Sequence, residues 1–441
     1  MKNFLILLIL IIPSVLYGQK NTAQLFEPAL IKADIDTLIS TLKNAHPTYQ
    51  QYYHKNNLQS KIDSIKKTIN TPISAIDFYR IMQPLICIDG HTSLRYNGDV
   101  YPKYENPLFP FKIVIYNNRL FIKENLSDNR SILKGMVIEK INGKSSNAII
   151  NHLIRYIPGE RESYKIKKLE QDFNYYYQLI YGSFQEFDIR VNKKELRLKG
   201  VNWSDITEPG KPPFELRFYD NDIAYICKRT FFPPNDFINF MDSAFHAISE
   251  RPIKYLIIDN QVGGGLTDLA DTLMTYFTNE PFSSFERKET KISSFTKDYI
   301  DIKKTEGYIK GGYFIQDFVP HSSDRQYRFS GTSYILTGPL SYSTATCFSA
   351  SAKCYKTALI VGEESGQPLL SNGGMAHFIL PTTKMVCITS LERIYMPCNN
   401  NDTMNGIKPD YYVEPTLDDL LNDNDYALEY LLKMIRENKN E

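Results

Sequence analysis

The chain has 441 residues, a length that predicts two or three domains. Hydrophobic residues make up 42% and charged residues 23%, as in ordinary globular proteins, which argues against a mainly disordered, collagenous or multi-span membrane protein. The 51 Lys and Arg against 50 Asp and Glu give a net charge of +1, so the chain has no excess of positive charge with which to bind nucleic acid.

The N-terminus has the pattern of a secretory signal peptide. Lys2 supplies a basic start, residues 4–17 are almost wholly apolar, and Gly18 is a small residue before a polar segment. The apolar run is shorter than the roughly 20 residues that a membrane-spanning helix needs. We therefore expect residues 1–18 to be removed as a signal peptide and to leave no permanent membrane anchor. The mature protein is then extracytoplasmic, either periplasmic or secreted.

Residues 19–100 are predicted to form a helical N-terminal domain. Apolar residues recur at helical spacing from about residue 25 to residue 85, and a third helix is predicted over 75–86. The His46-Pro47 step marks a break between helices, because the residue before a proline disfavours helical backbone. The domain ends at a polar turn over 89–92, which presents His91.

Residues 101–205 are predicted to form a β-rich module. Short strand-like runs cover 111–115, 119–122 and 137–141, and the last run leads into an Asn142-Gly143 turn and a helical stretch. The succession of strand, turn and helix after residue 137 suggests that the module binds an extended peptide by adding it to an edge of its sheet.

Residues 206–441 are predicted to form an α/β domain, because strands alternate with helices along this part of the chain. A polar stretch over 282–329 has weak periodicity and is expected to be an insertion or cap. A terminal helix is predicted over 418–436. The strands with a strongly apolar pattern are 223–226, 255–258, 333–337 and 358–361.

The six cysteines are scattered and form no Cys/His cluster, so the sequence predicts no structural zinc site. Cys347 and Cys354 share a predicted helix, where a rise of about 1.5 Å per residue places them too far apart for a disulfide. We expect the cysteines to be small, buried hydrophobic side chains.

Two segments of the α/β domain suit acyl-transfer chemistry. Ser341 and Ser343 precede a helix of small residues, so a hydroxyl there meets free N–H groups at a helix N-terminus. Gly263, Gly264 and Gly265 follow a short apolar strand and allow backbone N–H groups to approach a ligand closely. Each segment also has a purely structural interpretation, the first as a helix cap and the second as a tight strand-to-helix turn.

His91 is the candidate base, because it stands in a polar turn and is one of only seven histidines. His46 and His377 are its rivals, and a single histidine in a sequence is often structural. A nucleophile, a base and oxyanion donors in one exported chain together point to acyl transfer.

At these residues the chain resembles the serine peptidases of the C-terminal processing protease and tricorn core families. The resemblance implies a Clp-protease/crotonase-like α/β catalytic domain, preceded by a helical region and a PDZ-like module. No metal or organic cofactor is implied. The resemblance rests on segments that occur in the family's order, namely 85–92, 135–143, 256–265, 336–345 with 358–364, and 406–410.

The resemblance assigns roles to individual residues. Register against the Gly-Glu signature at 362–363 makes Ser343 the nucleophile, and the tricorn-like branch makes His91 its general base. The oxyanion donors are then the backbone amides of Gly264, Gly265 and Thr344.

Other positions depart from the family's pattern. Gln367 and the residues after it stand where the processing branch keeps a catalytic lysine, which argues against a Ser-Lys dyad. Gln261 and Gly263 replace the family's Arg and Asn. Asp402 lies beside the expected place of the carboxylate in the tricorn-like branch and is assigned as the third catalytic residue.

The resemblance therefore implies an exported serine peptidase that hydrolyses peptide bonds by acyl-enzyme chemistry. Its substrate is a peptide or an unfolded protein. The departures at the glycine turn and at Gln367 keep an alternative open, a catalytically inactive, peptide-binding pseudoprotease.

Overall fold

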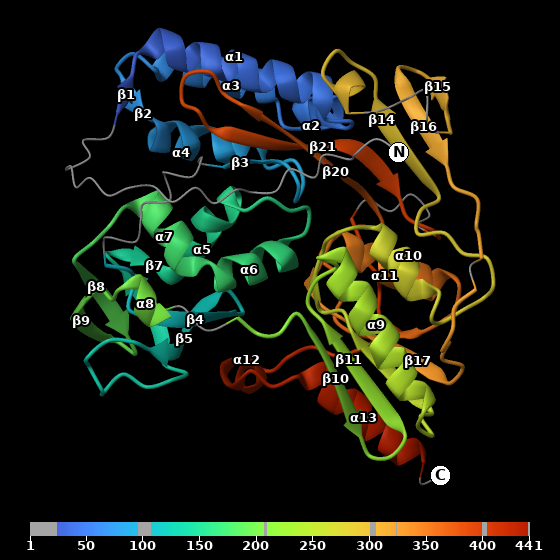
Figure 1. Cartoon of the computed structure of the whole chain (residues 1–441). Helices are drawn as coiled ribbons and strands as arrows, with labels where there is room; N and C mark the ends of the chain where they lie inside the picture. Colours follow the sequence, from blue (N-terminus) through green and yellow to red (C-terminus); the bar gives the residue numbers. More distant parts are fainter. Residues whose placement is uncertain are drawn as a thin grey trace.

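The computed structural model shows three regions, with the N-terminal helices at the top of Figure 1, the β-rich module at the left and the α/β domain at the lower right. The predicted signal peptide and Asp402 both lie outside the described residues. Within the described residues, every helix is too short or too polar to span a membrane. The structure describes residues 24–95, 107–206, 210–299, 306–322, 324–398 and 404–439.

The N-terminal region consists of helices and a short two-strand ladder. Its first helix begins with Pro28 and ends at Ala45, and the following residue, His46, has extended backbone because Pro47 disfavours helical backbone at the residue before it. The hydroxyl of Ser74 caps the fourth helix by accepting from the Asp77 amide. The elements are α1 (Pro28–Ala45), α2 (Tyr49–Lys55), α3 (Leu58–Thr68), α4 (Ala75–Ile86), β1 (Leu25–Phe26) and β2 (Ile73–Ser74).

The module is an antiparallel sheet with helices packed on it. Its strand order is β4-β5-β6-β8-β9, with β7 paired to β6. The strands are β4 (Phe111–Tyr116), β5 (Arg119–Asn125), β6 (Val137–Ile141), β7 (Lys144–Ser145), β8 (Glu186–Val191) and β9 (Lys194–Lys199), and the helices are α5 (Ser146–Leu153), α6 (Glu162–Gln171), α7 (Phe173–Tyr181) and α8 (Trp203–Ile206).

The strand that motivated the peptide-addition prediction has no free edge. Strand β6, which contains the predicted run over 137–141, pairs with β5 on one side and with β8 on the other. An added peptide needs unpaired backbone groups along one edge, so β6 itself does not offer the place for it, and peptide addition at an edge strand of the sheet stays a prediction. The edge strands of the sheet are β4 and β9, and an isolated bridge joins Leu108, before β4, to Val201, after β9.

The helical region and the module share one hydrophobic core. Leu38 and Phe78 from the helices belong to the same buried cluster as Phe109 and Ile189 from the module. This common core means that the two regions predicted as separate domains stabilise one another.

The α/β domain is built on a central, mostly parallel sheet, as the sequence predicts. Strand β10 runs antiparallel to β11, and the other neighbours are parallel. Helices α9 (Pro234–Ser249), α10 (Asp268–Met274) and α11 (Thr344–Cys354) cover one face, and α13 (Tyr426–Asn438) covers the other. The strand order is β10 (Phe214–Tyr219), β11 (Ile223–Lys228), β12 (Tyr255–Asp259), β17 (Thr332–Thr337), β19 (Leu359–Gly362) and β22 (Tyr411–Tyr412).

A second sheet joins the N-terminal region to the α/β domain. Residues 282–329, expected as an insertion or cap, instead supply β14 (Arg287–Lys291), β15 (Tyr308–Lys310) and β16 (Tyr313–Asp317) to this sheet. These strands were not predicted from the sequence, because they are polar and their alternation of apolar and polar residues is weak. The other members are the long hairpin of β20 (Leu370–Ile379) and β21 (Val386–Tyr395), and β3 (Ser93–Arg95), which pairs with β21.

The pairing of β3 with β21 fixes the position of the His91 turn. Ser93, which follows His91 by only two residues in the chain, lies opposite Ile388. The N-terminal region thereby delivers its polar turn to the α/β domain.

The C-terminal segment and one cysteine pair differ from the predictions. The expected terminal helix is divided into α12 (Leu417–Asn422) and α13 (Tyr426–Asn438), because Asp423 adopts left-handed backbone with a φ of 55°. Cys354 forms a disulfide with Cys398, at a Cα–Cα distance of 5.8 Å. The expectation of buried, unpaired thiols therefore holds for Cys87, Cys227, Cys347 and Cys387 but not for this pair.

Candidate active site

Parallel pairing brings the glycine turn against the serine segment. Strand β13 (Val262–Gly263) follows the central strand β12, and β18 (Leu340–Ser341) follows β17. These short strands pair with each other, with Gly263 opposite Ser341. The carboxyl ends of two neighbouring parallel strands thus supply both halves of one site, the usual location of ligand sites in α/β folds.

Ser343 occupies a strained backbone position at the start of α11. Its φ is 56° and its ψ is −126°, outside the regions that L-residues normally adopt. Its amide donates to Gln367 Oε1 at 2.6 Å. Its hydroxyl does not cap the helix and has no hydrogen-bond partner among the described residues. The turn therefore holds the backbone and leaves the hydroxyl available.

Ser341, two residues earlier, has a structural role instead. Its side chain is fully buried, and its hydroxyl donates to the Asn260 carbonyl at 2.6 Å. The same oxygen accepts from the Gly338 amide at 3.0 Å. Because the Ser341 hydroxyl both donates and accepts a hydrogen bond, it fixes the loop and is not available as a nucleophile.

The glycine turn faces Ser343 closely. A Cβ atom on Gly264 would lie 3.5 Å from the Ser343 Cβ. Gly263 and Gly265 have φ values of 116° and 142°, which disfavour any residue with a side chain, and a Cβ on Gly265 would also collide with the Phe231 carbonyl oxygen. The sequence pattern of three glycines is explained by this close approach of backbones.

Backbone amides are available where the oxyanion would form. The amides of Gly264, Gly265 and Thr344 have no backbone or side-chain acceptor within the described part of the chain. The Thr344 hydroxyl donates to the Gly265 carbonyl at 2.7 Å, which joins the helix start to the glycine turn. Free N–H groups fixed on two converging segments are what an oxyanion site requires.

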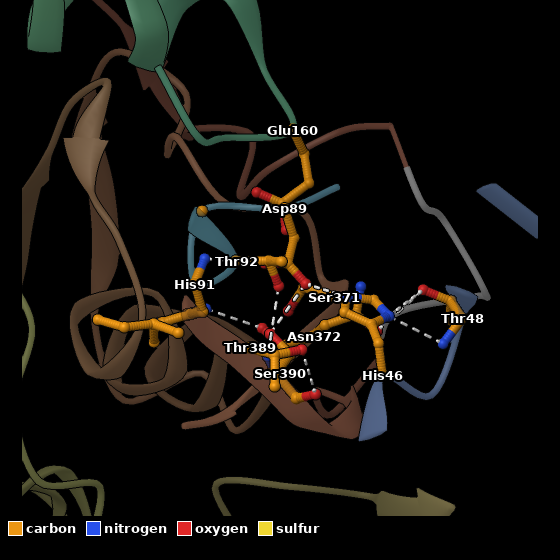
Figure 2. A network of polar contacts seen from close by, with 12 residues as sticks. His46, Thr48, Asp89, His91, Thr92, Glu160, Ser371, Asn372, Thr389 and Ser390 are labelled. Atoms are coloured by element: carbon orange, nitrogen blue, oxygen red, sulfur yellow. Dashed lines mark hydrogen bonds and ion pairs between the residues drawn. The ribbon is translucent and has the colours of Figure 1, made fainter. Parts of the chain in front are cut away.

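The His91 ring is oriented by a backbone carbonyl. Its Nδ1 lies 3.0 Å from the Asn372 carbonyl oxygen, which can only accept, so Nδ1 carries the proton (Figure 2). Nε2 is then the unprotonated nitrogen and has no hydrogen-bond partner among the described residues. Burial lowers the pKa of His91, although the charge of Asp89 opposes this effect. A neutral ring with a free Nε2 is suited to act as a base.

His91 and Ser343 are connected through Asn372 and Gln367. The Gln367 side-chain amide donates from Nε2 to the Asn372 carbonyl at 3.4 Å, and its Oε1 accepts from Ser343. The His91 ring also lies beside Tyr342, with the ring centroids 5.3 Å apart. No direct hydrogen bond joins His91 to the Ser343 hydroxyl among the described residues, so the candidate base and nucleophile are linked only through Asn372 and Gln367.

A buried carboxylate stabilises the His91 turn. Asp89 accepts from the His91 amide at 2.9 Å, from His46 Nε2 at 2.8 Å and from the Ser390 hydroxyl at 2.9 Å (Figure 2). His46 Nδ1 accepts from the Thr48 amide, so the ring donates to Asp89 from Nε2. Burial alone would raise the pKa of Asp89, but the hydrogen bonds and the nearby histidines lower it overall. The carboxylate is therefore ionised.

A second carboxyl group reaches the site from the module. Glu160 accepts from the Tyr342 hydroxyl, and that hydroxyl accepts from the Gly90 amide at 3.0 Å. The Oε1 atom of Glu160 is buried and has no hydrogen-bond partner in the part of the chain that the structure describes. Burial, with a contribution from Asp89, raises the pKa of Glu160 to about 8, so it is protonated at neutral pH.

The remaining predicted positions fall into two groups. His46 belongs to the site as a partner of Asp89, whereas His377 is exposed on β20 and lies outside it. Asp402 lies outside the described residues. Among the described residues no group of His, Cys, Asp and Glu side chains could hold a metal ion.

The sequence analysis missed four contributors, Gln367, Asn372, Glu160 and Tyr342. Gln367 was visible only as a replacement for lysine, and Asn372 acts through its backbone, which leaves no mark in side-chain patterns. Glu160 and Tyr342 become significant only when the module meets the serine loop.

Comparison with known proteins adds a family and a fold. Residues 222–413 match the model of Peptidase family S41. The structure is similar to the crystal structure of mature CPAF, with 13% sequence identity, a TM-score of 0.65, and coverage of 92% of this chain and 96% of that chain. It is also similar to mature CPAF complexed with lactacystin, with 14% identity, a TM-score of 0.65, and coverage of 92% and 97%. No curated protein matches the chain.

Proposed function

We propose that this chain, which belongs to peptidase family S41 and is a serine-type peptidase, hydrolyses peptide bonds through an acyl-enzyme on Ser343, with His91 as the general base. His91 Nε2 takes the Ser343 hydroxyl proton while Oγ attacks the peptide carbonyl carbon. The amides of Gly264, Gly265 and Thr344 hold the oxyanion. His91 then gives its proton to the leaving amine, and water releases the acyl group by the same route.

One observation carries this proposal: the base and the nucleophile are each fixed by a contact that leaves the reacting atom free. His91 is held through Nδ1 by Asn372, and Ser343 is held through its amide by Gln367. The Asn372 carbonyl links the two contacts, because it accepts from the His91 ring and from the Gln367 side chain. A purely structural serine and histidine would use the hydroxyl and Nε2 in their own hydrogen bonds.

Residue 402 is the candidate for a third catalytic group. Cys398 is held by the disulfide to Cys354, and the Met404 carbonyl accepts from Arg161 at 2.8 Å. We propose that Asp402, between these anchors, supports the base electrostatically, while Asn372 fixes the ring.

We further propose that the protein works in an oxidising, extracytoplasmic compartment after removal of residues 1–18. The Cys354–Cys398 disulfide supports this location, because disulfides persist outside the cytoplasm. N-terminal sequencing of the protein recovered from its native compartment should begin near residue 19. An intact Met1 on the functional protein would contradict export.

The proposed substrate is a peptide or an unfolded protein, and the PDZ-like module is proposed to help hold it. The module bears directly on the site, since Arg161 pairs with Glu364 through two hydrogen bonds, at 2.9 and 2.7 Å. Glu160 next to it contacts Tyr342. A substrate bound by the module would therefore be close to the nucleophile loop.

A peptide-binding protein without turnover is the second candidate. The observation that favours it is the missing hydrogen bond between His91 and the Ser343 hydroxyl within the described residues. Catalytic hydrogen bonds are often long in enzymes without substrate and shorten when the substrate binds, so this geometry is compatible with both candidates.

Turnover distinguishes the two candidates. Wild-type protein, incubated with an unfolded polypeptide, should release fragments that mass spectrometry can detect, and Ser343→Ala should release none. If both proteins bind the polypeptide and neither cleaves it, the second candidate is correct.

A further inference from the structure

Lys228 is a fully buried lysine beside the active site with no hydrogen-bond partner. It is the last residue of β11, its side chain has no exposed surface, and its Nζ finds no acceptor among the described residues. A buried ammonium without a partner is costly, because it loses its hydration and gains no hydrogen bond. Such a group calls for a functional explanation.

Just after the neighbouring strand β12, the side-chain oxygen of Asn260 also lacks a hydrogen-bond partner among the described residues. Cys227 lies opposite Asp259 in the last pair of the parallel ladder of β11 with β12, and Lys228 and Asn260 are the residues that follow these two in the chain. The Asn260 side chain donates from Nδ2 to the Ala345 carbonyl at 2.7 Å and to the Ser349 hydroxyl at 2.6 Å, while its Oδ1 has no partner among the described residues. Asn260 thus ties the end of β12 to the first turns of the nucleophile helix.

Lys228 also contacts the segment that supports the glycine turn. Its Nζ lies 3.9 Å from the centroid of the Phe231 ring, in a cation–π contact. The Phe231 amide donates to the Gly264 carbonyl at 2.9 Å, and its carbonyl accepts from the Leu266 amide at 3.1 Å. Phe231 therefore connects the Lys228 ammonium to the backbone of the glycine turn (263–265).

We propose that Lys228 is a positioning residue of the oxyanion site, whose ammonium, held on the Phe231 ring, places a positive charge behind the amides of Gly264 and Thr344. The charge favours the negative oxygen that forms there during acylation. This inference rests on the proposed function, because it requires Ser343 to form that oxyanion.

The charge state of Lys228 changes within an accessible pH range. Burial lowers the pKa of Lys228 to about 7, and the neighbouring Asp259 and Cys227 oppose this effect. An unfolded chain would keep the lysine protonated up to its ordinary pKa near 10.5. The buried ammonium therefore reduces stability fully below about pH 7, and this cost disappears as the pH approaches 10.5.

Lys228→Met tests the inference, since methionine fills the same volume without a charge. The readout is the rate at which a fluorophosphonate labels Ser343, followed by mass spectrometry from pH 5 to pH 10. Below about pH 7 the variant should label about tenfold more slowly than wild type, the effect of a unit charge over roughly 10 Å at an effective dielectric constant near 20. Above about pH 9 the two rates should converge. The variant should also melt at a higher temperature than wild type at pH 6.

Lys254→Met is the matched control, because Lys254 precedes β12 and is exposed. Its labelling rate should equal that of wild type at every pH. If Lys228→Met does not fold, Lys228→Gln keeps a polar group without the charge and should show the same pH-dependent ratio.

The outcomes separate the two proposals. Wild type that fails to label overturns the proposed function, and this inference with it. Wild type that labels, with Lys228→Met or Lys228→Gln labelling equally fast below pH 7, overturns this inference alone. A slower rate that is the same fraction of wild type at all pH values also overturns it, because that result indicates a packing role.

Discussion

The glycine turn (263–265) and the His91 turn (89–92) both belong to the proposed site around Ser343, but they are built by different means. The glycine turn is made of backbone, with Gly263 and Gly265 in conformations that glycine favours and with amides of Gly264 and Gly265 that have no acceptor among the described residues. The His91 turn is made of buried side chains, in which Asp89 accepts from partners 43 and 301 residues away in the chain.

The difference shows which half of the site can tolerate substitution. A backbone turn depends on a few local residues and fails when a side chain is introduced. A buried polar network depends on every partner at once, because removing one leaves a buried charge incompletely satisfied. Substitutions in the two regions should therefore have different signatures in activity and in stability.

His91→Ala should have the largest effect, because it removes the base while leaving the glycine turn intact. We expect the rate of peptide cleavage to fall by about 10³-fold or more. Burial lowers the pKa of His91 below 6.5, so the acidic decline of wild-type activity should lie at pH values below this. The residual activity of the variant should lack that acidic decline. A variant with the wild-type pH profile would assign the base to another group.

Gly265→Ala should damage the backbone half of the site. The new Cβ would collide with the Phe231 carbonyl, so the turn must move and its amides must shift away from the oxyanion. We expect about a 10²-fold loss in kcat, of the size seen when one oxyanion donor is lost. Gly210→Ala is the control, since a Cβ there meets nothing within 4 Å. Equal kcat values for the two variants would show that the turn is not part of the site.

His46→Ala should disturb the buried network around the His91 turn, and its main effect should be on stability. It deprives the buried Asp89 carboxylate of one partner, and we expect a loss of about 3 kcal/mol in the free energy of unfolding, measured by denaturant titration. The rate should fall by only about tenfold, since Asn372 still orients His91. His54→Ala, at an exposed position on α2, should change stability by less than about 0.5 kcal/mol.

The same network predicts a loss of stability in acid. The folded state lowers the pKa of Asp89 below its ordinary value of 3.8, so its contribution to stability is complete above about pH 4. That contribution is lost as the pH falls further through the folded-state pKa. His46→Ala should weaken this dependence. An unchanged acid dependence would mean that the pair of His46 and Asp89 contributes little.

Glu160→Gln should have the smallest effect on the rate at neutral pH. Because the pKa of Glu160 is raised to about 8, the wild-type carboxyl is already neutral there and glutamine reproduces its charge. Ionisation in the unfolded state should make wild type progressively less stable than the variant as the pH rises from about 4.5 to about 8. Thermal melts across this range measure the difference, and parallel curves for the two proteins would contradict the assigned protonation.

The two halves of the site also differ in how far the sequence could predict them. The glycine turn and the serine helix lie in short apolar and small-residue patterns, so local reasoning located the two segments, and the family resemblance assigned the roles of Ser343, Gly264 and Thr344 within them. The acceptor of His91 is a backbone carbonyl 281 residues away, and no local pattern identifies it. The choice of Ser343 over Ser341 came from the family resemblance, and the buried Ser341 hydroxyl supplies the physical reason.

Similar limits apply to the fold. The alternation of buried strands and amphipathic helices predicted the α/β domain, because each element carries its own period. The joining of β14–β16 to the second sheet and the pairing of Cys354 with Cys398 depend on contacts between distant segments. Short, polar strands and single cysteines carry no local signal of such partners.

The central claim is that His91 activates the Ser343 hydroxyl, and covalent labelling by a fluorophosphonate tests it most directly. Labelling requires a nearby base and a preformed oxyanion site. We predict that wild type and Ser341→Ala label at Ser343, that Ser343→Ala does not label, and that His91→Ala labels orders of magnitude more slowly. Wild type that remains unlabelled, under conditions where a known serine peptidase reacts, would contradict the account. Labelling that is as fast in His91→Ala as in wild type would contradict it equally.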